Sequence, residues 1–171
     1  MKKILAVLLL LGLTATAGQA QLIKLGIGAE LPLPTGTFGD VVSSGFGGTA
    51  IAKLKIPIID IYGAVDYLNF GEKEITGTGT TGSVKNSATM WGINAGATIS
   101  LFVVLYGGVE VGSYIISQKT ETAGAPATTS DITRGAIAPV VGASFAMFDL
   151  SARYVIMENT DFFVVRGAIF F

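Results

Sequence analysis

The sequence ends in the apolar segment Asp161-Phe-Phe-Val-Val-Arg-Gly-Ala-Ile-Phe-Phe171. Side chains of a β-strand alternate between two faces, so every second residue shares a face. The face that contains Phe163, Val165, Gly167, Ile169 and Phe171 is uncharged, and the opposite face carries Arg166. Chain termini are usually polar and frayed. An apolar last strand is expected where it pairs with the first strand, because closing a barrel removes both sheet edges.

Seven further segments upstream have strand character. They cover residues 22–33, 44–55, 59–71, 88–101, 103–117, 134–146 and 150–157, and the terminal segment is the eighth. The clearest alternation is in the first, where Ile23, Leu25 and Ile27 interleave with Lys24 and glycines. Eight strands of about ten residues are long enough to cross hydrocarbon when tilted. The sequence therefore predicts an all-β fold, an eight-stranded antiparallel up-and-down transmembrane β-barrel.

The connections between these segments alternate in length. Residues 34–43, 72–87 and 118–133 read as long polar loops, whereas the turns near residues 56, 102 and 148 are tight. The last connection, 158–161, is short and breaks the alternation. Short turns at one rim and long loops at the other are typical of outer-membrane barrels.

One stretch also permits a different topology. Residues 86–109 contain no charge, so a hydropathy window would mark them as a transmembrane helix. Gly92, Asn94, Gly96, Thr98 and Ser100 nevertheless fall on one face at a period of two. A helix would spread these residues around its surface, whereas a hairpin keeps them on one side. We therefore expect a hairpin.

The composition and the first residues indicate an exported, membrane-embedded chain. Of 171 residues, 50% are hydrophobic and only 13% are charged, with a mean hydropathy of +0.63. In soluble domains roughly a quarter of the residues are charged. Lys2 and Lys3, an apolar run and Gly18-Gln-Ala20 predict a cleavable signal peptide at 1–20, with the barrel domain at 21–171. Ala15-Thr-Ala17 is an alternative cleavage site.

The charges of the predicted strands share one face. If the other face meets lipid, these side chains converge in the lumen: Lys24, Glu30, Lys53, Asp66, Glu110, Arg134, Arg153 and Arg166. Buried charges persist when they are paired and hydrogen-bonded, and an eight-stranded lumen is just wide enough for side chains to fill. We expect a structural network that satisfies the lumen and specifies register. The alternative is a narrow polar path. The tyrosines and Trp91 suit aromatic girdles at the membrane interfaces.

The residue types exclude most site chemistry. The chain has no His and no Cys, so Ser–His–Asp catalysis and thiolate metal sites are ruled out. The stretch 77–83 is rich in glycine but lacks the lysine of a P-loop. The predicted mature chain has 9 basic and 12 acidic residues, which does not favour nucleic-acid binding. We expect neither an enzyme nor a cofactor.

The signal peptide, the eight alternating segments, the loop rhythm and the terminal Phe171 together resemble the small outer-membrane β-barrel family (porin-like, OmpA/OmpX-type barrels). The resemblance implies a C-terminal assembly signal at Phe171, Ile169 and Phe163, read by the barrel-assembly machinery. It also implies location in the bacterial outer membrane, with lipid and lipopolysaccharide as partners. Barrel enzymes of that membrane (lipid A deacylases, lipid A palmitoyltransferases and omptin proteases) rely on a catalytic histidine that this chain lacks.

Three functions follow as hypotheses. The first is a non-enzymatic integral outer-membrane protein of a Gram-negative envelope, with a structural role or a surface-interaction role through its long extracellular loops and an unknown surface ligand. The second is a narrow pore or a transport barrel for small or apolar solutes. The third is a secreted, soluble lipocalin-like barrel. The third would invert the faces and put Ile23, Leu25 and Ile27 inside.

Overall fold

The computed structural model describes residues 23–76, 83–122 and 128–171. Its elements are β1 (Ile23–Pro34), α2 (Gly36–Val41), β2 (Ser43–Lys55), β3 (Ile59–Thr76), β4 (Ser83–Ser100), β5 (Leu105–Thr122), β6 (Thr128–Phe145), β7 (Phe148–Val155) and β8 (Phe162–Phe170). The predicted signal peptide and the glycine-rich tip at 77–82 lie outside these residues.

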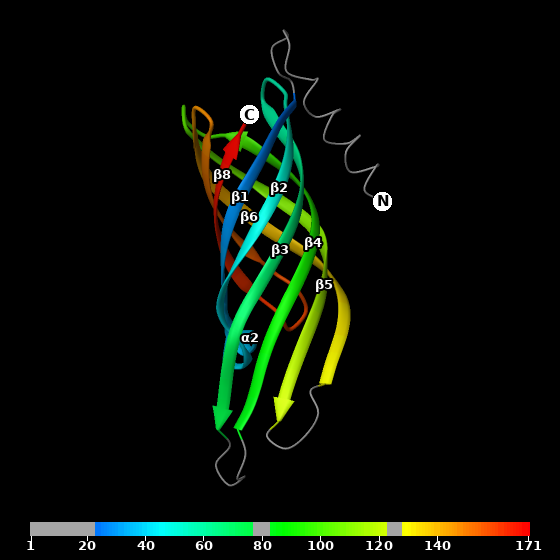
Figure 1. Cartoon of the computed structure of the whole chain (residues 1–171). Coiled ribbons are helices and arrows are strands. Elements are labelled where there is room, and N and C mark those ends of the chain that lie inside the picture. Colours follow the sequence, from blue (N-terminus) through cyan, green and yellow to red (C-terminus); the bar gives the residue numbers. More distant parts are fainter. Residues whose placement is uncertain (1–22, 77–82, 123–127) are drawn as a thin grey trace, which may run out of the picture.

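The eight strands form one closed barrel in chain order (Figure 1). Each strand pairs antiparallel with its neighbour in sequence, and β1 pairs with β8 from Gly26 opposite Phe170 to Pro34 opposite Phe162. The prediction that the terminal strand closes the barrel is thus confirmed. Residues 86–109 form parts of β4 and β5, joined by a tight turn, as the hairpin reading predicted. No helix within the described ranges is long and apolar enough to span a membrane.

The outer wall is apolar and the interior holds the charges. Large apolar side chains face outward on every strand, for example Ile27, Ile93 and Val141, with 62%, 72% and 60% of their surface exposed. Arg153 and Glu30, by contrast, are buried in the lumen. This arrangement is opposite to the one that the lipocalin-like hypothesis requires.

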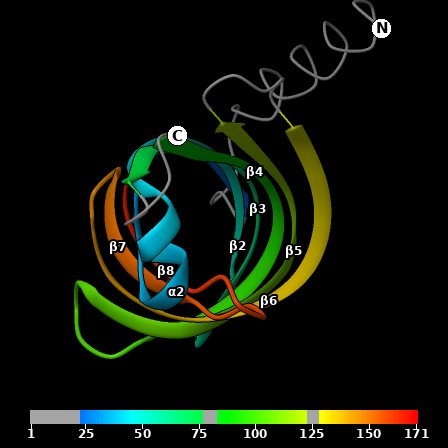
Figure 2. The ribbon, with the colours of Figure 1, turned by 90° about the horizontal axis from the view of Figure 1, so that it is seen from below.

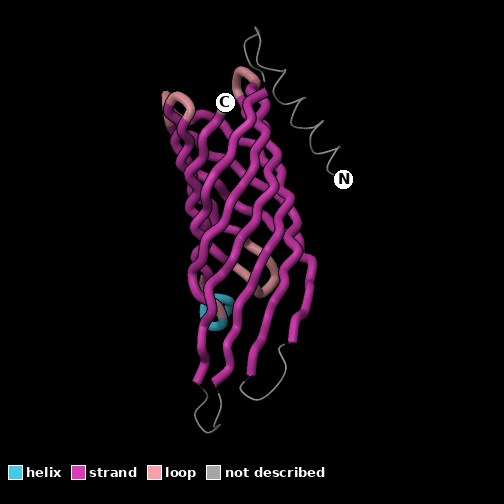
Figure 3. The backbone as a smooth tube through the Cα atoms, in the orientation of Figure 1, coloured by secondary structure: helices cyan, strands magenta, loops and turns pink. Residues whose placement is uncertain are grey.

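Two predicted loops are wrong over most of their length. The described parts of the segments 72–87 and 118–133 instead continue the strands. As a result β3 to β6 each have 18 residues, whereas β7 has 8 and β8 has 9. These continuations, residues 72–76, 83–87, 118–122 and 128–133, project beyond the rest of the barrel as a four-stranded sheet, here called the extension (Figure 3). Polar residues fall on both of its faces, as with the adjacent Lys73 and Glu74 of β3, so the two-residue period that marks a half-buried strand is absent from the sequence.

The extension carries the ion pair of Lys119 and Glu121 on its surface. Lys119 Nζ lies 2.5 Å from Glu121 Oε1, and both side chains are exposed. Their mutual hydrogen bond and attraction raise the pKa of Lys119 and lower the pKa of Glu121. Such charged side chains are those expected of a sheet that stands in water.

The predicted first loop, 34–43, contains the short helix α2. Its Phe38 is buried, with its ring at a centroid distance of 5.0 Å from the ring of Phe70, edge to face. The Lys73 ammonium donates a hydrogen bond to the Gly39 carbonyl oxygen at 2.6 Å. Viewed along the barrel, α2 lies inside the ring of strands (Figure 2). The helix therefore closes the loop-side mouth, above an apolar cluster that includes Phe70, Tyr114 and Phe162.

Candidate functional site

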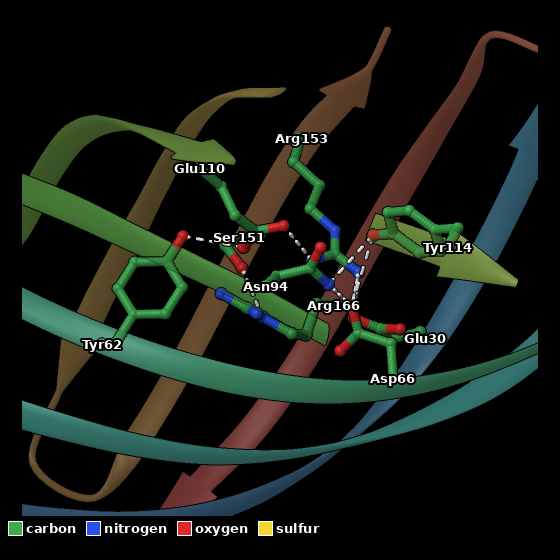
Figure 4. Close-up of polar contacts among 9 residues, drawn as sticks. All are labelled: Glu30, Tyr62, Asp66, Asn94, Glu110, Tyr114, Ser151, Arg153 and Arg166. Carbon is green, nitrogen blue, oxygen red and sulfur yellow. Dashed lines mark hydrogen bonds and ion pairs between the residues drawn. The ribbon is translucent and has the colours of Figure 1, made fainter. Parts of the chain in front are cut away.

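The centre of the lumen is organised around the Arg153 guanidinium on β7. It donates hydrogen bonds to Glu110 Oε1 at 2.5 Å, Asp66 Oδ2 at 2.7 Å and Glu30 Oε1 at 2.9 Å. These acceptors come from β5, β3 and β1, so all three bonds cross the lumen (Figure 4). All four residues are at most 2% exposed. Charge-assisted bonds in a dry interior are strong, and each partner here offsets the desolvation of the others.

Neutral hydrogen-bond donors contact two of the three carboxylates, those of Asp66 and Glu110. Asp66 Oδ2 accepts a bond from Asn94 Nδ2 at 2.5 Å and from the Tyr114 hydroxyl at 3.4 Å. Tyr62 donates its hydroxyl to Glu110 Oε2 at 2.9 Å (Figure 4). We refer to Glu30, Tyr62, Asp66, Asn94, Glu110, Tyr114 and Arg153 as the lumen network. Tyrosine and asparagine suit this position because they donate hydrogen bonds without adding charge.

Arg166 on β8 lies beside the lumen network. Its Nε donates to Ser151 Oγ at 3.1 Å, and its guanidinium lies 5.8 Å from the centre of the Tyr62 ring. Counting Arg166, two guanidinium groups face the three carboxylates of Glu30, Asp66 and Glu110. The central cluster thus has more acids than bases when every carboxyl is ionised.

A second polar cluster lies nearer the tight turns and is centred on Asp149. Its Oδ1 accepts a bond from the Tyr106 hydroxyl at 2.7 Å, and its Oδ2 accepts from Ser144 at 2.5 Å and from Lys53 Nζ at 3.4 Å. The Lys53 ammonium also lies 4.6 Å from the centre of the Phe170 ring. This cluster pairs one acid with one base and is buried at its centre.

The predicted lumen charges thus divide into groups. Glu30, Asp66, Glu110 and Arg153 contact one another, and Arg166 lies next to them. Lys53 belongs to the Asp149 cluster. Arg134 instead pairs with Glu158, an exposed residue at the loop end, and Lys24 is half-buried opposite Lys53 in the β1–β2 register. The residues predicted as an assembly signal, Phe163, Ile169 and Phe171, lie on the outer face of the terminal segment and are exposed.

Sequence reasoning missed four members of these clusters. Tyr62, Tyr106 and Tyr114 were expected in membrane-interface girdles but lie inside, where each hydroxyl contacts a carboxylate. Asp149 was expected in a turn. The two-residue alternation of side chains along a strand would have placed the tyrosines inside, because Tyr106 and Tyr114 share a face with Glu110 and Tyr62 shares one with Asp66. On the outer wall, the rings of Tyr67 and Trp91 do contact each other, tilted by 57° with their centres 4.8 Å apart.

The arrangement is suited to filling space and pairing charge. Within the described residues, no group of three or more ligand-type side chains has the geometry to hold a metal ion. Two open hollows of ≈ 520 and ≈ 530 Å³ lie against the barrel wall rather than along its axis, and their lining includes the outward-facing Ile27, Val65, Leu150 and Ile169. At the level of the lumen network the interior is packed with side chains.

Structural comparison identifies the architecture. The chain aligns with Ail, the attachment invasion locus protein of Yersinia pestis, with a TM-score of 0.58 and 10% identity over 86% of this chain and 96% of that one. Neisserial surface protein A aligns with a TM-score of 0.52 and 14% identity over 90% and 98% of the two chains. The fold is that of the small outer-membrane β-barrels.

A third protein with the small outer-membrane barrel fold is similar over the same extent. The N-terminal β-barrel domain of Pseudomonas aeruginosa OprF aligns with a TM-score of 0.52 and 11% identity, over 86% of this chain and 97% of that domain. No protein-family model and no curated protein matches the sequence. The similarity therefore concerns the arrangement of strands.

Proposed function

We propose that the protein is a non-enzymatic integral outer-membrane protein of a Gram-negative envelope, exported by the predicted signal peptide at 1–20. The observation that carries the proposal is the distribution of polarity on a closed barrel. Every strand turns large apolar side chains outward, while Arg153 and its three carboxylate partners are buried inside. A closed barrel satisfies its backbone hydrogen bonds without water, which is the condition for crossing a bilayer as strands.

The interior has a structural role in this proposal. The lumen network joins β1, β3, β5 and β7 through one guanidinium, so it fixes the strands at one level relative to one another. A buried charged network specifies register because any slip would leave a charge without a partner. The packed lumen and the mouth closed by α2 do not favour the narrow-pore hypothesis.

The extension is the surface through which the protein would act outside the membrane. It carries charges of both signs. They are three lysines and four acids: Lys73, Lys85, Lys119, Glu72, Glu74, Glu121 and Asp131. Ail has been solved in complex with the heparin analogue sucrose octasulfate, which is an anionic ligand. The mixed charge of the extension does not favour the same ligand class here, because binding a sulfated sugar requires a predominantly basic surface.

Cell fractionation and heat modifiability test the proposal together. The protein is expressed with its signal sequence, and the outer membrane is separated and run on a denaturing gel with and without boiling. We expect an outer-membrane band that migrates faster when unboiled. Because the chain has no cysteine, a single Glu74→Cys variant should react with an impermeant maleimide on intact cells. A periplasmic or secreted protein without a mobility shift would contradict the proposal.

A further inference from the structure

The end of the barrel opposite the extension is formed by three unusually apolar turns. Residues 56–58, 101–104 and 146–147 connect β2 to β3, β4 to β5 and β6 to β7, and we call them the turn rim (Figure 1). None of these nine residues is charged. Ile58, Phe102 and Val103 are 83%, 73% and 102% exposed. Turns in water favour Gly, Asn, Asp, Ser and Pro, and of these the turn rim contains only Pro57.

The turn rim is continuous with the apolar outer wall. Ile99 and Leu101 continue the outward column of β4 down to Phe102, and Phe145 and Phe148 flank the neighbouring turn at 146–147. All of these side chains are exposed. Isolated apolar residues on a surface are ordinary, but a contiguous patch marks an interface. Here the apolar patch of the turn rim continues without interruption into the outer wall that we assign to lipid.

The height of the barrel places this rim at the membrane. Trp91, whose ring contacts that of Tyr67, marks the extension side of the apolar wall, and Leu101 is ten residues further along the chain. At ~3.3 Å per residue and a tilt of roughly 40°, this separation is about 25 Å along the barrel axis. A lipid-facing band is also about 25 Å tall. The turn that follows Leu101 therefore reaches the inner interface and does not pass far beyond it.

Part of the backbone of the turn rim is paired within the protein, which lowers the cost of moving these turns from water to the headgroup boundary. The N–H groups of Leu101 and Phe102 both donate to the Leu105 carbonyl oxygen, at 2.9 and 3.2 Å. The carbonyl oxygens of Val104 and Met147 accept bonds from neighbouring strands, each at 2.8 Å. Unpaired backbone groups are what exclude ordinary turns from apolar surroundings.

The polar groups near the turn rim indicate how deep it lies in the membrane. An open hollow of ≈ 410 Å³ is lined by Lys55, Ile56, Pro57, Ile58, Asp60 and Ser100. A surface that combines one cation, one anion and apolar side chains suits the boundary between headgroups and acyl chains better than the hydrocarbon core.

We propose that the turn rim is inserted into the inner leaflet of the membrane, with Phe102 and Val103 at the boundary between lipid headgroups and acyl chains. The proposal rests on the membrane location proposed above. It makes the turns a lipid-binding surface that holds the barrel at a fixed depth, instead of connections that stand in the periplasm.

Single-cysteine variants test this insertion, because the native chain has no cysteine to remove. Val103→Cys places a probe in the turn rim, Val111→Cys in the middle of the outer wall, and Glu74→Cys in the extension. Each variant carries a fluorophore, is reconstituted in phosphatidylcholine vesicles, and is checked for heat modifiability. Quenching by iodide present on both sides of the bilayer is compared with quenching by two phosphatidylcholines, one brominated near the headgroup end of its acyl chains and one brominated near the chain ends.

The expected result is that the lipid brominated near the headgroup end quenches the Val103 probe and iodide does not, whereas iodide alone quenches the Glu74 probe. If a brominated lipid quenches Val111 but iodide reaches Val103, the turns stand in water and the inference is overturned. A Val103 probe protected from iodide and from both lipids would mean that protein covers the rim, which also overturns it. If neither brominated lipid quenches the Val111 probe, the membrane location itself is wrong.

Discussion

Replacing Arg153 with methionine should remove the largest single source of stability in the lumen. The side chain makes three charge-assisted hydrogen bonds, to Glu30, Asp66 and Glu110, and all four residues are buried. Removing one partner of a buried ion pair costs about 3–5 kcal/mol, because charges are left without compensation. Three carboxylates would then be left to Arg166 and to neutral donors. We expect Arg153→Met to lower the free energy of unfolding by about 3–5 kcal/mol.

The chain contains a matched control for this substitution. Arg134 also lies on the inner side of its strand, but it pairs with Glu158 at the loop end, where the Glu158 side chain is 79% exposed. Exposed pairs contribute about 0–1 kcal/mol, so Arg134→Met should change stability little. A double-mutant cycle of Arg153→Met with Glu110→Gln should give a coupling energy of about 0.5–3 kcal/mol, since the two side chains are in contact.

Urea titration in lipid vesicles measures these differences. Trp91 is the only tryptophan and lies on the outer wall, so its fluorescence follows the transfer between lipid and water. The unboiled gel band shows independently whether each variant is folded. Equal losses for Arg153→Met and Arg134→Met would refute the conclusion that the lumen network dominates the stability of the interior.

Three further variants test other parts of the structure by the same titration. Glu30→Gln should lose less than about 1.5 kcal/mol, because the amide oxygen still accepts from a guanidinium and the excess of acids falls; a loss as large as that of the arginine variant would contradict this charge count. Gly96→Ala should cost about 1–3 kcal/mol, because its Cβ would lie 2.4 Å from the Tyr62 ring, whereas Gly167→Ala, with nothing within 4 Å, should be neutral. Phe38→Ala should cost about 3–5 kcal/mol and expose the 35–42 segment to protease; an unchanged cleavage pattern would show that α2 does not depend on its buried ring.

The sequence predicted the barrel because the membrane imposes a two-residue period on every strand that crosses it. Phe163, Val165 and Ile169 are outside and Arg166 is inside for that reason alone. The same rule fails for the extension, where β3 to β6 meet water on both faces and no period is imposed. The helix α2 was missed because it is six residues long, contains two glycines and is held by contacts of Phe38 with distant strands.

The two-residue alternation is also limited within the lumen. It predicts which side chains point inward, but it does not predict their height along the barrel axis. The height depends on the stagger between strands, which accumulates around the barrel. Arg134 and Lys53 therefore point inward as expected and yet lie above and below the cluster that contains Arg153. The Asp149 cluster escaped prediction for the same reason, because its members are 96 and 43 residues apart in sequence.

The pairing of β1 with β8 affects the rates at which the barrel folds and unfolds. Gly26 and Phe170 pair across 144 residues of chain (170 − 26), while every other pairing joins sequence neighbours and can grow as a hairpin. Contacts at such separation form late, because the entropy of loop closure opposes them. All three bonds of Arg153 skip at least one strand, so they also appear only when the sheet curls shut. Interactions that form after the folding transition state slow unfolding rather than speed folding. The finished barrel should therefore be long-lived, since no strand can leave until the bonds at the centre of the lumen have broken.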